Sequence, residues 1–185
     1  HADNFPEFMR QFHERYDDML EPEIMAFLDE TVRVGVPVYH DLPDAPPPTV
    51  QHLDFRLDNM LFEPRSGSDP LAVLDWQSVS AGPGALDVSY FNGAGLLPDV
   101  RQANERALFE RWHEGLKRYG VTDYDADKAW RDYRLHVMQG LCTAIFASVA
   151  TKRTERGDAM FLTMARRHAW QAQDLDTLGL LARLS

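Results

Sequence analysis

The stretch that decides the fold is HLDFRLDNMLF, residues 52–62. Its polar residues lead into a short apolar run at Met60–Phe62, and a second apolar run follows at Leu71–Leu74. Residues 63–70 between the two runs are rich in Pro and Ser and include Gly67 and Asp69, a composition that favours turns. This order of segments predicts a small β-hairpin.

Polar side chains gather at the outer ends of this hairpin. Asp54 and Asn59 come before its first strand, and Asp75 comes directly after its second strand. Because a hairpin brings its outer ends together, these three side chains are expected to face one pocket. Carboxylate and amide oxygens are ligands that Mg²⁺ accepts, and a carboxylate outside the metal shell is free to take a proton from a hydroxyl nucleophile. The sequence therefore predicts a site for a divalent metal and phosphate.

Three short motifs follow one another between residues 52 and 89. Residues 52–59 have the pattern H-x-D with Asn five positions after the Asp, and residues 73–76 read VLDW. Residues 82–89, GPGALDVS, have the pattern G-x-x-x-x-D-[LV]-[AS]. In this order and spacing they resemble the catalytic loop, the metal-binding strand end and the following segment of the aminoglycoside phosphotransferase and choline kinase group. The resemblance runs from about residue 5 to 180, and that group shares the protein-kinase fold.

The resemblance implies a role for each motif residue. It makes Asp54 the catalytic base, and it makes Asn59 and Asp75 the Mg²⁺ ligands. It makes Asp87 a carboxylate that braces the backbone of the catalytic loop, and it makes His52 a structural member of that loop. It also implies ATP as the phosphate donor and a small hydroxylated molecule as the acceptor.

The chain departs from the group's pattern in two places. Leu53 stands between the His and the catalytic Asp, where the group usually has Gly, so a positive φ there would strain the loop. The chain also has no glycine-rich loop before a strand Lys, and we interpret residues 92–95, NGAG, as a turn. We therefore expect a C-terminal catalytic lobe whose N-terminal lobe is absent and which binds ATP weakly by itself.

The role of Arg56 remains open at this point, and so do two alternative functions of the chain. Arg56 either pairs with a nearby carboxylate or touches the substrate, and Asp58 is interpreted as a solvated or turn-capping acid. The first alternative function is a non-catalytic kinase-like binding or scaffolding module. The second is a metal-dependent hydrolase that uses His52, Asp54 and Asp75.

Helices are predicted on both sides of the hairpin, so the predicted fold class is mainly α with one small β-hairpin. Residues 1–49 are predicted to contain two short helices within 5–34 and a Pro-rich connector at 35–49. Residues 50–90 hold the catalytic loop and hairpin. Residues 99–185 form a helical substrate-side subdomain, in which apolar periodicity predicts helices at 104–119, 125–152 and 158–184.

Composition excludes several classes of partner. The chain has 185 residues and a formal net charge of −10 without a basic cluster, so we expect no binding to nucleic acid or to a membrane. A lone cysteine, Cys142, and the absence of a signal pattern predict a cytoplasmic protein. Apolar surface left by the absent lobe, near residues 1–10 and around the hairpin, is expected to promote a homodimer.

Overall fold

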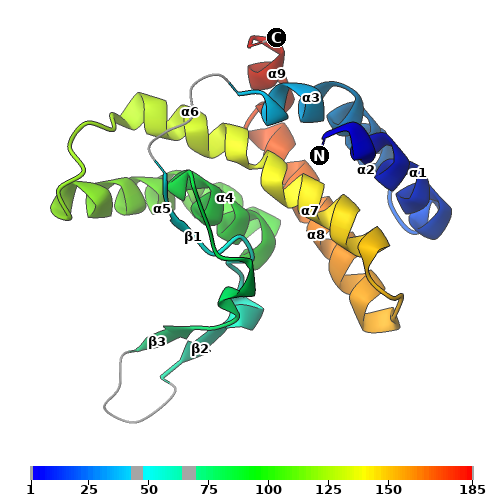
Figure 1. The fold of residues 1–185 in the computed structure, drawn as a ribbon, viewed down its shortest axis with the longest axis horizontal. Coiled ribbons are helices and arrows are strands. Elements are labelled where there is room, and N and C mark those ends of the chain that lie inside the picture. The colour runs from blue at the N-terminus through cyan, green and yellow to red at the C-terminus, as the bar shows by residue number, and fades with distance from the viewer. Residues whose placement is uncertain (1, 43–47, 64–69, 185) are drawn as a thin grey trace.

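The computed structural model describes residues 2–42, 48–63 and 70–184 (Figure 1). Within these ranges the chain is mainly helical, with two small antiparallel sheets of two strands each. None of the described helices combines the length and the apolar character needed to cross a lipid bilayer. The helices and strands in chain order are α1 Phe5–Tyr16, α2 Pro22–Glu30, α3 Val36–His40, β1 Thr49–Gln51, β2 Met60–Phe62, β3 Leu71–Val73, β4 Ser80–Gly82, α4 Gly84–Gly95, α5 Pro98–Arg118, α6 Ala126–His136, α7 Met138–Ala150, α8 Glu155–Asp174 and α9 Thr177–Ala182.

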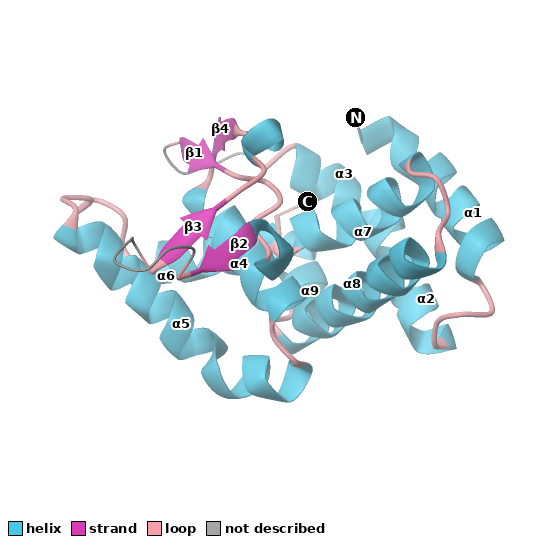
Figure 2. Ribbon diagram, turned by 90° about the horizontal axis from the view of Figure 1, so that it is seen from below, coloured by secondary structure: helices cyan, strands magenta, loops and turns pink. Residues whose placement is uncertain are grey.

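The predicted hairpin is confirmed. Strands β2 and β3 pair antiparallel, with Met60 opposite Val73 and Phe62 opposite Leu71, and the hairpin projects from the helical body (Figure 1). The second sheet, in which β1 pairs with β4, was not predicted. Figure 2 shows that all four strands gather on one side of the helices.

The predicted connector at 35–49 is wrong over its first six residues. The helix that begins at Pro22 continues through a π-helical turn, Thr31–Gly35, into α3. Pro37 has no N–H and its ring crowds the preceding turn, which would break a regular helix. The wider turn absorbs this conflict, since the Val36 N–H bonds the carbonyl of Thr31, five residues back. The prolines at 43, 46 and 47 lie outside the described residues.

The predicted turn at 92–95 is also wrong, because residues 84–95 form α4. The glycines serve close helix packing rather than a turn. A Cβ on Gly93 would lie 2.1 Å from Oε1 of Gln171 and 2.4 Å from Nδ1 of His168, both on α8. Only glycine therefore allows α4 and α8 to approach this closely.

The C-terminal helices were predicted in type but not in extent. α5 begins at Pro98, six residues before the predicted start. The predicted helix 125–152 is divided at Val137 into α6 and α7. The predicted helix 158–184 begins earlier, after a Thr154 cap, and is divided at Asp176, whose φ of 52° is left-handed.

The main core lies where α1, α2, α7 and α8 pack together (Figure 1). The predicted buried stripe is confirmed at Tyr133, Val137, Leu141, Ile145 and Val149. Trp130, the first residue of that predicted stripe, is only partly buried. A second, smaller core cluster lies between α4, α5 and α6 and consists of Ala85, Phe109, Tyr124, Ala129 and Tyr133.

A buried polar network joins α5 to α6 and α8. Arg101 is 1% exposed and forms ion pairs with Glu105 on its own helix and with Asp174 at the end of α8. The Glu105 carboxylate also accepts hydrogen bonds from the Tyr133 hydroxyl at 2.8 Å and from the Gln171 amide at 2.7 Å. One carboxylate therefore connects three helices in the interior.

Two buried histidines make stability depend on pH. Burial lowers the pKa of His136 and of His168 to about 4, from an ordinary value of 6.5. Below pH 6.5 these histidines are protonated in the unfolded chain but remain neutral in the folded chain. The free energy of unfolding therefore falls as pH decreases toward 4. We expect a loss of about 2 kcal/mol for each histidine between pH 7 and pH 5, measured by urea denaturation.

One variant isolates the contribution of His168. His168→Gln should lose about half of this pH dependence, whereas His40→Gln, at an exposed side chain, should keep it. Burial lowers the pKa of His13, but its ion pairs with Asp17 and Asp29 outweigh this, so the net pKa is raised. His13 therefore stabilises the fold as pH falls, and it does so equally in the wild type and in the two variants. An unchanged pH dependence in His168→Gln would refute this account.

Candidate active site

The loop that carries the predicted site residues is held by one carboxylate. Asp87, in the first turn of α4, accepts the backbone N–H of His52 at 2.7 Å and the backbone N–H of Leu53 at 2.9 Å. Each oxygen of the carboxylate takes one of these bonds. Asp87 therefore fixes the start of the loop against a helix that is itself packed in the core.

His52 links the same loop to the end of the hairpin. Its Nε2 lies 2.7 Å from the carbonyl oxygen of Leu74, and its Nδ1 accepts the backbone N–H of Asp54 at 3.3 Å. A ring that carries its proton on Nε2 satisfies both contacts. The ring also packs against Trp76, at 4.7 Å between centroids. Both nitrogens are occupied, so His52 has no nitrogen left for a metal, which argues against the hydrolase alternative.

The Asp54 carboxylate is surrounded by three donors yet remains one-third exposed. The Asn59 side chain donates to its Oδ2 at 2.8 Å, and the Tyr90 hydroxyl donates to its Oδ1 at 3.2 Å. Nε of Arg56 lies 3.0 Å from Oδ1. These contacts fix the orientation of the carboxylate while leaving part of it open to solvent.

Asn59 and Asp75 lie at neighbouring strand ends. The Leu74 N–H donates to the Asn59 carbonyl at 2.8 Å, which extends the β2–β3 ladder by one pair and brings Asp75 beside the end of the loop. Asp75 is exposed and has a left-handed φ of 60°. Asn59 and Asp75 flank the paired outer ends of the two strands, so the hairpin brings them to one edge.

The oxygens at this edge suit a hard cation. The Asn59 side-chain amide uses its nitrogen on Asp54, donating to the backbone carbonyl at 2.9 Å as well as to the carboxylate. Its amide oxygen makes no hydrogen bond among the described residues, and neither does the Asp75 carboxylate. An amide oxygen and a carboxylate fit Mg²⁺, which keeps several waters and phosphate oxygens in its shell. Within the described ranges no group of three or more His, Cys, Asp or Glu side chains could hold a metal.

Arg56 pairs with the loop's own carboxylates. Its guanidinium contacts Asp54 and, at 2.9 Å through Nη1, Asp58. Burial lowers the pKa of Arg56, but the two carboxylates outweigh this and the net pKa is raised. The first of the two roles considered for Arg56, pairing with a carboxylate, is therefore present in the structure.

Tyr90 contacts the predicted site residue Asp54, although the motifs did not reveal it. Burial first, and then the Asp54 charge, raise the pKa of its hydroxyl, so it stays a hydrogen-bond donor at neutral pH. It lies three residues after Asp87 on α4, one helical turn further along the same face. That spacing from a motif residue is the signal that could have identified it.

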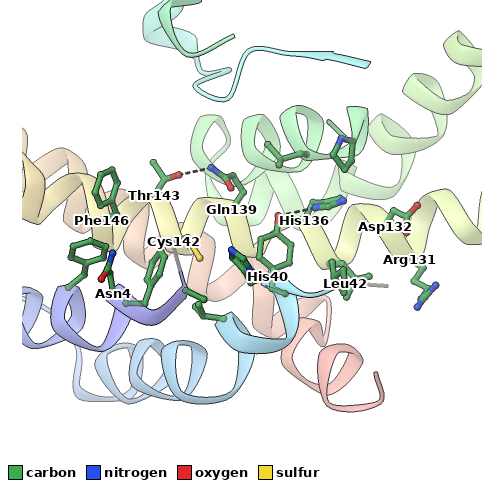
Figure 3. Close-up of a pocket in the computed structure, with 18 residues that line it drawn as sticks. Asn4, His40, Leu42, Arg131, Asp132, His136, Gln139, Cys142, Thr143 and Phe146 are labelled. Carbon is green, nitrogen blue, oxygen red and sulfur yellow. Dashed lines mark hydrogen bonds between the residues drawn. The ribbon is translucent and has the colours of Figure 1, made fainter. Parts of the chain in front are cut away.

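Two cavities differ in their position relative to the predicted site residues. One of about 390 Å³ lies beside the loop of predicted site residues, between Arg56, Asp58, the end of α4 and α8. A larger one of about 620 Å³ lies between the N-terminal helices and α7, lined mainly by apolar side chains (Figure 3). Its polar wall includes Gln139 and His136, and it contains none of the predicted site residues. The smaller cavity is lined by Arg56, Leu57 and Asp58, which belong to the loop that carries Asp54.

Leu53 adopts a left-handed conformation with φ of 65°. This conformation costs a non-glycine residue about 1–2 kcal/mol. Glycine adopts this conformation without strain, but it loses more conformational entropy on folding than alanine does. We therefore expect the free energy of unfolding of Leu53→Gly to be about 1 kcal/mol higher than that of Leu53→Ala. Both variants lose the leucine side chain, so urea denaturation of the pair isolates the backbone effect, and equal stabilities would contradict it.

The sequence of the chain is similar to those of known proteins over part of its length. The model of the phosphotransferase enzyme family matches residues 2–135. A stretch of 50 residues is 46% identical to the Acyl-CoA dehydrogenase family member 10 of Mus musculus, a match that covers 27% of this chain and 5% of the mouse protein. No solved structure matches the chain.

Proposed function

The chain belongs to the phosphotransferase enzyme family, and from that premise we propose that it is the catalytic lobe of an enzyme that transfers the γ-phosphate of ATP to a hydroxyl of a small molecule. The observation that carries the proposal is the setting of Asp54. Its carboxylate is held by Asn59, Arg56 and Tyr90 in a loop that Asp87 fixes, and it remains partly exposed. A base that must meet an incoming hydroxyl needs this combination of fixed orientation and access.

Asp54 acts as the base in the proposed reaction. The acceptor oxygen attacks the γ-phosphorus, the bond from that phosphorus to the bridging oxygen of ADP breaks, and the hydroxyl proton moves to the Asp54 carboxylate. Asn59 and Tyr90 keep the carboxylate in place through their hydrogen bonds. Arg56 balances its negative charge.

Asn59 and Asp75 are the residues that would hold Mg²⁺. Their side-chain oxygens have no hydrogen-bond partner among the described residues, and the two residues lie at one edge of the hairpin. When bound, the metal neutralises charge on the phosphates of the nucleotide. Asp54 is then left as the carboxylate that is free to accept a proton.

Binding of the nucleotide needs further contacts, and we propose that a lobe or chain packed against this one supplies them. All three lysines, Lys117, Lys128 and Lys152, follow the hairpin by more than 40 positions and lie on or beside the helices after α4. Large apolar side chains are exposed around the strands, with Phe62 at 64% and Val50 at 68%. We propose that this surface meets an N-terminal lobe, or a second copy of the chain in a homodimer, and that the chain by itself binds ATP weakly. A cytoplasmic location remains part of this proposal.

The non-catalytic alternative is favoured by two features of the sequence, Leu53 and the missing glycine-rich loop and strand Lys, and the structure bears on the first. A loop distorted by this residue would support a binding or scaffolding module. Leu53 instead adopts the left-handed conformation while its N–H still donates to Asp87. The loop hydrogen bonds therefore favour the enzyme over the module.

The test measures the magnesium requirement of ATP-dependent phosphorylation by the full-length protein. Asp75→Asn should raise the half-saturating Mg²⁺ concentration at least about tenfold, because it removes a charged oxygen ligand. Asp123→Asn, at an exposed loop aspartate, should leave it unchanged. The metal assignment fails if Asp75→Asn requires no more Mg²⁺ than the wild type.

A further inference from the structure

The cavity of about 390 Å³ opens beside the loop that carries the proposed base. Arg56 forms part of its wall, and Nε of the same residue lies 3.0 Å from the Asp54 carboxylate. Gly95 at the end of α4 and Met160 on α8 line other walls. Asp54 itself does not line the cavity, so Arg56 is the residue that joins a compound bound in this space to the proposed base.

The charges around this cavity are mostly positive. Its walls carry three arginines, Arg56, Arg156 and Arg167, against one acidic residue, Asp58. The charge of Arg56 is already balanced by Asp54 and Asp58. The excess positive charge therefore comes from the two arginines of α8.

Neither arginine of α8 has its charge neutralised within the described part of the chain. Arg167 donates from Nη1 to the carbonyl oxygen of Ala94 at 2.6 Å, a neutral partner that also holds the guanidinium against the end of α4. Arg156 is exposed and makes no ion pair or hydrogen bond with any described residue. Both guanidiniums therefore retain donors for an anion.

The two arginines stand at opposite ends of one wall. They are eleven residues apart, three helical turns, so both belong to the same face of α8. Between them the wall is formed largely by Ala159, Met160, Thr163 and Met164. A ligand would thus meet a largely apolar middle and a positive charge at either end.

We infer that this cavity binds the phosphate acceptor and that the acceptor is a small hydroxylated anion, with a carboxylate or phosphate group on a short carbon skeleton. A guanidinium pairs well with either oxyanion, through two parallel hydrogen bonds. An amino alcohol would instead bring a cation to two unneutralised arginines. The inference rests on the proposed function, since it takes the ligand of this cavity to be the acceptor.

A matched series of three-carbon compounds tests the charge preference. Binding to the full-length protein is measured by isothermal titration calorimetry at pH 7 without nucleotide, using glycerol, glycerate, glycerol 3-phosphate and 3-amino-1,2-propanediol. We expect glycerate or glycerol 3-phosphate to bind at least about tenfold more tightly than glycerol, and the amine no more tightly than glycerol. The better of the two anions identifies the oxyanion. Equal affinities, or a preference for the amine, would overturn the inference.

Variants locate the anion within the cavity. Arg156→Gln or Arg167→Gln should reduce the affinity for the preferred anion at least about fivefold, and Arg111→Gln, at an exposed position on α5, should not change it. Arg156 is exposed and unpaired within the described residues, so its variant should fold even if Arg167→Gln does not. Anion affinity that withstands both α8 substitutions would refute the assignment.

Failure of this inference differs from failure of the proposed function. Selective anion binding without phosphorylation of any hydroxyl compound would refute the proposed function but leave an anion site at α8. Phosphorylation of glycerol and the amine as readily as of the anions would refute this inference but leave the proposed function intact.

Discussion

Asp54→Asn is expected to lower kcat of the full-length protein by about 10²–10⁴-fold, the range that a general base contributes. An amide of nearly the same size cannot take the hydroxyl proton. The backbone hydrogen bonds that hold the loop, from His52 and Leu53 to Asp87, do not involve the substituted group. Steady-state kinetics should show the loss, while circular dichroism and the melting temperature should show a folded protein.

Asp123→Asn is the control for this variant. Asp123 is an exposed loop aspartate and contacts none of the candidate site residues. Its substitution should leave kcat within about threefold of the wild-type value, since a surface substitution away from the site has little effect. If Asp54→Asn retained more than about a tenth of the wild-type kcat, Asp54 would not be the base.

Arg101→Met is expected to lower the free energy of unfolding by about 3–5 kcal/mol, the cost of removing one partner from a buried ion pair. The Arg101 side chain is 2% exposed and the Glu105 side chain 5% exposed, so the carboxylate that remains would stay in the interior without its cation. Its hydrogen bonds from Tyr133 and Gln171 do not replace the lost charge. Urea denaturation measures the change.

Two further variants define this effect. Arg118→Met breaks an ion pair with Glu114 on the same helix, whose side chains are 75% and 65% exposed, and should cost no more than about 1 kcal/mol. Adding Glu105→Gln to Arg101→Met should recover part of the stability, because it removes the unpaired charge. A similar loss in Arg101→Met and Arg118→Met would contradict the account.

The spatial arrangement of the candidate site residues could be predicted from the sequence, because local geometry brings most of them together. Asn59 and Asp75 flank two strands joined by one turn, so pairing of Met60 with Val73 is enough to bring them together. The predicted fold class, a mainly helical kinase-like lobe with a small hairpin, is confirmed by the structure and by the family match. Pairing of strands that are close in the sequence and apolar periodicity can both be recognised in a single sequence.

The features that were missed depend on contacts distant in the chain. Gly93 is a poor helix former by itself, yet α8 packs so closely that only glycine fits, and tertiary contact outweighs the local preference. Pro37 is tolerated because a π-helical turn precedes it. Strands β1 and β4, three residues each and separated by the whole hairpin region, carry too little pattern to be recognised.

Phosphorus-31 NMR of the full-length protein with ATP and Mg²⁺ tests the central claim most directly, with the anionic and neutral hydroxyl compounds above as acceptors. The account predicts that the γ-phosphate signal of ATP is replaced by that of a phosphomonoester, and that Asp54→Asn slows this conversion by about 10²–10⁴-fold while leaving the fold intact. Release of inorganic phosphate without an ester, or ester formation at the same rate in Asp54→Asn, would contradict it.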